Sequence, residues 1–214
     1  MRLALAQGAD GIELDVRLCK SGEVIVLHDV DLKRLAGVAL RAQDATLAEL
    51  QAHDLGGGER VPTLNDAIEV VLGSGAQIQL NVELKPDVPD EVELVDAVTS
   101  CVEAWAKEER ARLLISSFSA SICREMHRQL PELAVALLYE HEQDALSLPA
   151  GVTVVHPHHA LLDADKVAAL HARGLRVNTW TVNDPARALT LSQAGVDTII
   201  TDDVPAILAA LSSL

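Results

Sequence analysis

Two hydrophobic periodicities alternate along this chain of 214 residues. Residues 11–18 alternate apolar and charged side chains with period two, which predicts a half-buried strand after a short helix end at 2–7. A turn at 20–23 and an apolar run at 24–27 predict a hairpin return. After a looped stretch at 29–61 with a short helix near 47–51, helices are expected at 63–72, 91–107, 119–130, 164–173, 184–195 and 204–211, and strands at 78–85, 113–118, 134–140, 152–156, 176–182 and 198–201. Residues 139–152 are expected to hold no more than a short helix.

Without the hairpin return, the pattern gives seven strands in repeated strand–helix order. That order predicts a parallel sheet with helices outside, either as an open doubly wound sheet or as a barrel. Polar side chains recur on one face of several strands, at 13/15/17, 81/83/85 and 178/180. A polar face fits the mouth of a barrel lumen better than a sheet buried on both faces. We therefore expect one α/β domain over residues 1–214, with a TIM-type barrel favoured over an open sheet.

The charge balance restricts the classes of partner that we expect the chain to bind. The chain has 32 acidic against 17 basic side chains, a formal charge of −15, which argues against nucleic acid and anionic membrane surfaces. An anionic substrate would therefore need a bound cation. No run of 18 apolar residues is present, so no membrane span is expected. Three cysteines, Cys19, Cys101 and Cys123, are too sparse for a disulfide framework or a zinc site.

Three acids are the strongest chemical signal. Glu13 and Asp15 stand two residues apart on one strand, so their side chains point to the same side, and Glu83 lies on the next barrel strand. Buried acids this close repel one another unless a cation lies among them. Ligation by oxygen alone suits Mg²⁺ or Ca²⁺. The alternative is that the acids form inward ion pairs with Arg17 and Lys85.

Three further residues are candidates for the same site. His28 ends the hairpin strand, where it is placed for proton transfer with Asp29 orienting it, or is a surface-loop histidine. Lys85 shares the face of Glu83 and would hold a phosphate oxygen, or pair with that acid. Trp180 would line a glycerol-sized pocket, or pack in the core.

The run His156-Pro157-His158-His159 has the residues of a metal cluster. Proline interrupts it, and no matching set of Cys or His lies nearby in the sequence. We expect these histidines to line a loop.

Seven segments of the chain carry a resemblance to a known family. They are Gly8-Ala9-Asp10-Gly11-Ile12-Glu13-Leu14-Asp15-Val16, Lys20-Ser21-Gly22-Glu23-Val24-Ile25-Val26-Leu27-His28-Asp29, Val61-Pro62-Thr63-Leu64, Asn81-Val82-Glu83-Leu84-Lys85, Ser116-Ser117-Phe118, Thr179-Trp180-Thr181-Val182-Asn183 and Gly195-Val196-Asp197-Thr198-Ile199-Ile200-Thr201-Asp202. Each segment is modest alone, but together and in this order they are specific. By these segments the chain resembles the glycerophosphodiester phosphodiesterases across nearly its whole length.

The resemblance implies a (β/α)₈ barrel that hydrolyses glycerophosphodiesters, small molecules of lipid metabolism, to glycerol 3-phosphate and an alcohol. It places one divalent cation on Glu13, Asp15 and Glu83. It makes His28 the general acid, and Lys85 and Trp180 substrate contacts. In the family's two-step reaction one histidine deprotonates the glycerol hydroxyl that attacks phosphorus, while another protonates the departing alcohol.

The resemblance also has a departure. The family begins with a strand bearing His-Arg-Gly and a helix with a Pro-Glu-Asn turn, whereas Met1-Arg2-Leu3-Ala4 matches the middle of that helix. We therefore expect a barrel that lacks its first strand, with a gap between the strands at 13 and 199 and self-association through the open edge. A cytoplasmic location is expected, with export as the alternative. Very weak turnover is expected, so a pseudo-enzyme or an inactive fragment that binds without turnover is the alternative function.

Overall fold

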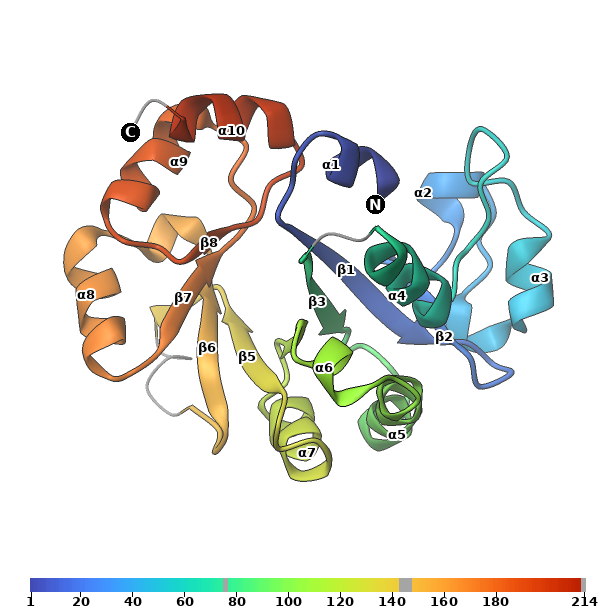
Figure 1. Ribbon diagram of the computed structural model, residues 1–214. Coiled ribbons are helices and arrows are strands. Elements are labelled where there is room, and N and C mark those ends of the chain that lie inside the picture. Colours follow the sequence, from blue (N-terminus) through green and yellow to red (C-terminus); the bar gives the residue numbers. More distant parts are fainter. Residues whose placement is uncertain (75–76, 143–147, 213–214) are drawn as a thin grey trace.

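The computed structural model describes residues 1–74, 77–142 and 148–212. A single curled sheet has the strand order β2-β1-β3-β4-β5-β6-β7-β8, and helices cover its outer face (Figure 1). The strands are β1 Gly11–Leu18, β2 Val24–Val26, β3 Gln79–Leu84, β4 Leu113–Ser117, β5 Ala134–Tyr139, β6 Val152–Pro157, β7 Arg176–Thr179 and β8 Thr198–Ile199. The helical elements are α1 Arg2–Ala6, α2 Lys33–Ala36, η1 Ala42–Asp44, α3 Leu47–Gln51, α4 Leu64–Gly73, α5 Glu91–Glu103, α6 Lys107–Arg110, α7 Ala120–Gln129, η3 His159–Leu161, α8 Ala164–Ala172, α9 Pro185–Gln193 and α10 Val204–Leu211.

The period-two pattern separates the two faces of the sheet. On β1, Ile12, Leu14 and Val16 join the apolar core that packs against α4, α5 and α7. Residues in between therefore face the lumen. Strands β1 and β3 are parallel, with Asp15 opposite Glu83 in the register. This register brings acidic side chains of two strands to one end of the lumen.

The hairpin strand β2 pairs antiparallel with only Val16–Leu18 at the end of β1. The stretch after it forms a small core of its own beneath α2, η1 and α3. The members of this core are Cys19, Ile25, Leu27, Leu32, Ala42, Ala45, Leu50 and Val61. The stretch that follows His28 therefore packs against the hairpin through this small core.

The sheet is open on one side, as expected. It ends at β2 and β8, and β8 pairs with β7 alone among the described strands. The seven barrel strands and the hairpin are confirmed. In Figure 1 the ends of the arc, β1 and β8, lie below α1 and α10. A Cβ on Gly8 would lie 3.5 Å from Cδ1 of Leu208, so α10 packs against the turn between α1 and β1.

Helix ends follow local signals. Thr63 caps α4 by accepting from the Asp66 amide, and Asp66 accepts from Thr63 in return. Gly174 ends α8 with φ +77, a conformation that glycine adopts without steric cost. No described helix is long and apolar enough to cross a membrane.

One expected helix is wrong. The span 91–107 divides into α5, which ends at Glu103, and α6, which begins at Lys107. Ala106 between them is extended (φ −62, ψ 148), and its amide donates to the carboxylate of Glu109 at 3.0 Å. That contact caps α6, and the extended Ala106 separates α6 from α5. The short helix considered for 139–152 falls partly on 143–147, outside the described residues.

Candidate active site

Three acids meet at one end of the lumen. Glu13 and Asp15 come from β1 and Glu83 from β3, and one ligand atom of each lies within 4.8 Å of the others. Glu83 is buried and the other two are partly buried. Oxygen ligands in this number and spacing can hold a divalent cation. The structure therefore brings together the three acids that the sequence nominated.

Lys85 lies among these acids. Its Nζ is 2.7 Å from Oδ1 of Asp15 and 2.7 Å from Oε1 of Glu83. The sequence alternative of inward ion pairs is thus correct for Lys85, whereas Arg17 contacts Asp87 instead, at 2.8 Å. One ammonium does not balance three ionised carboxylates, and the two uncompensated charges match those of one divalent cation.

The pKa shifts express the same imbalance. Burial, followed by repulsion from Asp15 and Glu83, raises the pKa of Glu13 to about 8 despite the nearby Lys85. Burial also raises the pKa of Glu83, and Lys85 only partly offsets it. Burial works to lower the pKa of Lys85, but its ion pairs outweigh this and the net shift is upward. The cluster therefore favours any additional positive charge.

His28 lies just past β2 and close enough to Glu83 to act on that carboxyl electrostatically. Its side chain is 63% exposed, and Nδ1 is 2.8 Å from Oδ1 of Asp29. Asp29 also accepts from Nε of Arg34 at 2.6 Å, and these two contacts lower its pKa to about 2. With Nδ1 engaged by an ionised acid, Nε2 is left to face a substrate.

Trp180 follows β7 on the lumen face. Its indole N–H donates to the carbonyl of His156 at 2.8 Å. Its ring meets the rings of Phe118 and His158 edge-on, with centroids 5.4 Å and 5.2 Å away. Phe118 was not nominated from the sequence, although it continues the lumen face of β4 two residues after Ser116. The half-buried Trp180 thus joins an aromatic edge of the mouth.

Comparison with known proteins agrees with this geometry. The model of the Glycerophosphoryl diester phosphodiesterase family matches residues 1–206. This chain belongs to that family. A glycerophosphodiester phosphodiesterase of Caldanaerobacter subterraneus is 30% identical over an alignment of 210 positions that covers 94% of this chain and 85% of that protein.

Solved structures of the family superpose closely on this member. A phosphodiesterase of Oleispira antarctica in complex with the product sn-glycerol-3-phosphate has a TM-score of 0.89 and 30% identity, covering 98% of this chain and 89% of that one. A glycerophosphoryl diester phosphodiesterase from Silicibacter pomeroyi, assigned as putative, has a TM-score of 0.90 and 26% identity, with 99% and 86% covered. The TIM-barrel architecture of this family member is therefore shown.

The expected loop-lining role of His156 in this phosphodiesterase family member is wrong. His156 lies on β6 with no solvent exposure, and its Nε2 accepts from Nδ2 of Asn178 at 2.9 Å. The strand continues through Pro157. Val155 packs with residues of α8 and α9 outside the sheet, so the adjacent His156 falls on the lumen face of β6. Burial lowers its pKa to about 3, which keeps it neutral.

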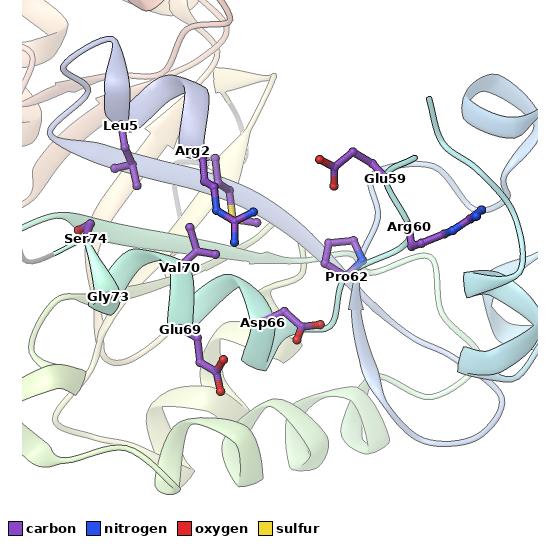
Figure 2. A pocket seen from close by; sticks show the side chains of 11 residues that line it. Arg2, Leu5, Glu59, Arg60, Pro62, Asp66, Glu69, Val70, Gly73 and Ser74 are labelled. Atoms are coloured by element: carbon purple, nitrogen blue, oxygen red, sulfur yellow. The ribbon is translucent and has the colours of Figure 1, made fainter. Parts of the chain in front are cut away.

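A second hollow in this family member lies away from the acids. It is a groove of about 610 Å³ between α1, α4 and the segment before Thr63 (Figure 2). Both helices pack on the outer face of β1, opposite to Glu13 and Asp15. Arg2, Arg60, Glu69 and Asp66 place both signs of charge around it. The groove is therefore separate from the candidate active site. The roles of the residues named for that active site stay predictions.

Proposed function

We propose that this chain hydrolyses glycerophosphodiesters to glycerol 3-phosphate and an alcohol. Family membership supports the reaction, and the Oleispira antarctica relative in complex with sn-glycerol-3-phosphate supports the product. The observation that carries the proposal is the cluster of Glu13, Asp15 and Glu83 around Lys85 at the lumen mouth.

One divalent cation, Mg²⁺ or Ca²⁺, would be held by Glu13, Asp15 and Glu83. The donor set fits, because it is oxygen only, partly buried and short of positive charge. When bound, the ion neutralises phosphate charge and lowers the pKa of an attacking hydroxyl. Lys85 then has a phosphate oxygen as a partner in place of the carboxylates that it now contacts.

His28 would donate the proton that the departing alcohol needs. Its ring is exposed and acts electrostatically on Glu83, and Asp29 engages Nδ1, which leaves Nε2 for the substrate. Trp180 would cover the carbon face of the glycerol, because its indole N–H is already used by the His156 carbonyl and its ring is left for apolar contact.

Hydrolysis of glycerophosphocholine tests the proposal. Release of glycerol 3-phosphate is measured for the 214-residue chain with Mg²⁺, with Ca²⁺ and with EDTA. We expect very weak turnover, present only with a metal and lost in Glu13→Gln. Glu103→Ala, an exposed acid on α5, is the control and should behave as the unaltered chain.

The alternative function is binding without turnover, by a pseudo-enzyme or an inactive fragment. Calorimetry with Mg²⁺ and glycerol 3-phosphate separates the two. Product binding that requires metal, with no release of glycerol 3-phosphate from the diester, would support the alternative. Absence of both binding and turnover would contradict the proposed site itself.

Self-association, cellular location and the absence of nucleic-acid binding stay predictions. Self-association is expected because β8 and the first half of β1 have a neighbour on one side only among the strands that the structure describes, and unpaired edges favour pairing with another chain. Light scattering tests this, and a monomer at high concentration would contradict it. A cytoplasmic location and the absence of nucleic-acid binding are testable by fractionation and by gel shift.

A further inference from the structure

A buried guanidinium lies beside the acidic cluster without taking part in it. Arg17 follows Asp15 by two residues on β1, and only 5% of it is exposed. Its Nε and Nη2 donate to the backbone carbonyl of His28 at 3.1 Å and 2.8 Å. Its Nη1 and Nη2 donate to the two carboxylate oxygens of Asp87 at 2.8 Å and 3.1 Å.

These contacts leave Arg17 little capacity for a substrate. A guanidinium has five N–H donors in a fixed fork, and the four contacts already engage all three of its nitrogens. An arginine this near a phosphate site would ordinarily be read as a phosphate ligand. Here the fork is filled by a carbonyl and by a bidentate carboxylate, so Arg17 acts on the chain itself.

The residues that Arg17 joins are informative. His28 stands just past β2, and Asp87 follows Lys85 by two residues after β3. One side chain on β1 therefore connects the ends of three strands that supply Asp15, His28 and Lys85. The contact between Arg17 and Asp87 spans 70 positions in the sequence.

We propose that Arg17, anchored by Asp87, is a positioning residue that fixes His28 relative to the acidic cluster. This inference rests on the proposed role of His28 in hydrolysis. The Arg17 guanidinium binds the backbone carbonyl of His28 and so fixes the backbone position of that residue. Asp29 binds the ring and so fixes the orientation of the imidazole.

The side-chain contacts of His28 are too exposed to do this alone. The His28 side chain is 63% exposed, and Arg34, which holds Asp29 from the other side, is 62% exposed. Exposed ion pairs hold geometry weakly because water and salt compete for them. The Arg17 side chain is 6% exposed, and a bidentate charge-assisted contact in such a place is both stronger and more directional.

Two substitutions separate positioning from support of the fold. Arg17→Lys keeps the charge but loses the fork, so one ammonium cannot hold both partners. Asp87→Ala removes an anchor whose side chain is 52% exposed, so it should leave the fold intact. Arg110→Lys is the matched control, because Arg110 is also a partly buried arginine with one carboxylate partner, Glu132 at 2.9 Å.

The decisive measurement is kcat against KM for glycerophosphocholine. We expect kcat to fall about 100-fold in Arg17→Lys and less in Asp87→Ala, since a displacement near 1 Å can cost that much. KM and the Mg²⁺ affinity from calorimetry should stay within about threefold. Arg110→Lys should leave all three unchanged. Wild-type kcat in both Arg17→Lys and Asp87→Ala would overturn the proposal, as would a kcat loss matched by an equal loss of metal affinity.

A second readout does not depend on turnover. Hydrogen exchange of amides from Leu27 to Leu32 should be faster in both variants, and the His28 ring resonances should broaden or shift. These changes in a chain without turnover would uphold the positioning role while the proposed function failed. Unchanged exchange and unchanged ring resonances in both variants would overturn the positioning role.

Discussion

The two sides of the lumen differ in the charge of their buried polar side chains. On the β1–β3 side, Glu13, Asp15 and Glu83 surround Lys85, and burial leaves the acids short of positive charge. On the β6–β7 side, His156 and Asn178 form a buried contact between neutral groups. Both sides show polar residues two apart on a strand. Charge is retained only where a counter-charge can be supplied, so the charged side is where a cation and an anionic substrate would bind.

The largest expected effect tests whether proton transfer belongs to the charged side alone. His28→Ala should lower kcat by about 10²–10⁴-fold, the range for a lost general acid. His156→Gln should change kcat by no more than a fewfold, because its pKa is near 3 and its ring is buried. Steady-state assays of the two variants provide the comparison. An equal loss from His156→Gln would show that the neutral side also takes part.

Metal should stabilise the molecule through the charged side. An ion that binds only the folded state raises the free energy of unfolding by about 2.7 kcal/mol at a hundred times its Kd. Thermal melts with EDTA and with excess Mg²⁺ or Ca²⁺ should therefore differ. Glu83→Ala should erase the difference. Identical melts of the unaltered chain would refute a metal site here.

Acid should destabilise the molecule through the neutral side. His156 has a folded-state pKa of about 3, below the ordinary 6.5, so its contribution is present above pH 6.5 and is lost as the pH falls. Between pH 6.5 and 5 this costs about 1.5 kcal/mol of unfolding free energy. Glu13, whose pKa is raised to about 8, gains stability over the same fall in pH and opposes this loss, so the difference between the unaltered chain and His156→Gln in urea unfolding at the two pH values measures the contribution of His156. The unaltered chain should lose more stability, or gain less, than His156→Gln as the pH falls, and equal changes in the two would count against a buried neutral imidazole.

The smallest expected effect concerns Trp180, which contacts the neutral side through the His156 carbonyl. Trp180→Phe keeps an apolar ring but removes the indole N–H that donates to His156. The loss should reduce the unfolding free energy by about 1 kcal/mol. The KM for glycerophosphocholine should rise modestly with kcat nearly constant. A large fall in kcat would instead place Trp180 closer to the reacting atoms.

Local signals predicted the elements that local physics determines. Period two gave Gly11–Leu18 with its observed bounds, and the helix expected at 204–211 is observed as Val204–Leu211. The break after Glu103 was missed because the apolar stripe does not show that Glu109 caps a new helix at Ala106.

The acidic cluster could be predicted because period two on β1 and a recognisable motif on β3 fix which way its side chains point. Long-range contacts were beyond the same reasoning. Nothing in the sequence near Arg17 shows that its partner is Asp87 rather than an acid of the cluster. His156 was expected to line a loop because a proline follows it, whereas β6 continues through that proline and the histidine is buried. Tertiary packing decided both.

Lys85 has a consequence for how the protein is made. A site with three unopposed acids would resist folding until an ion arrived, as in small domains that metal assembles. Here the ammonium, 2.7 Å from two of the acids, gives newly synthesised chain an internal substitute for the missing charge. Folding would then not have to wait for metal, and loading would be an exchange in which an ion displaces the Lys85 ammonium from the acids. Metal supply would set the fraction of loaded molecules, whereas unloaded molecules would still fold.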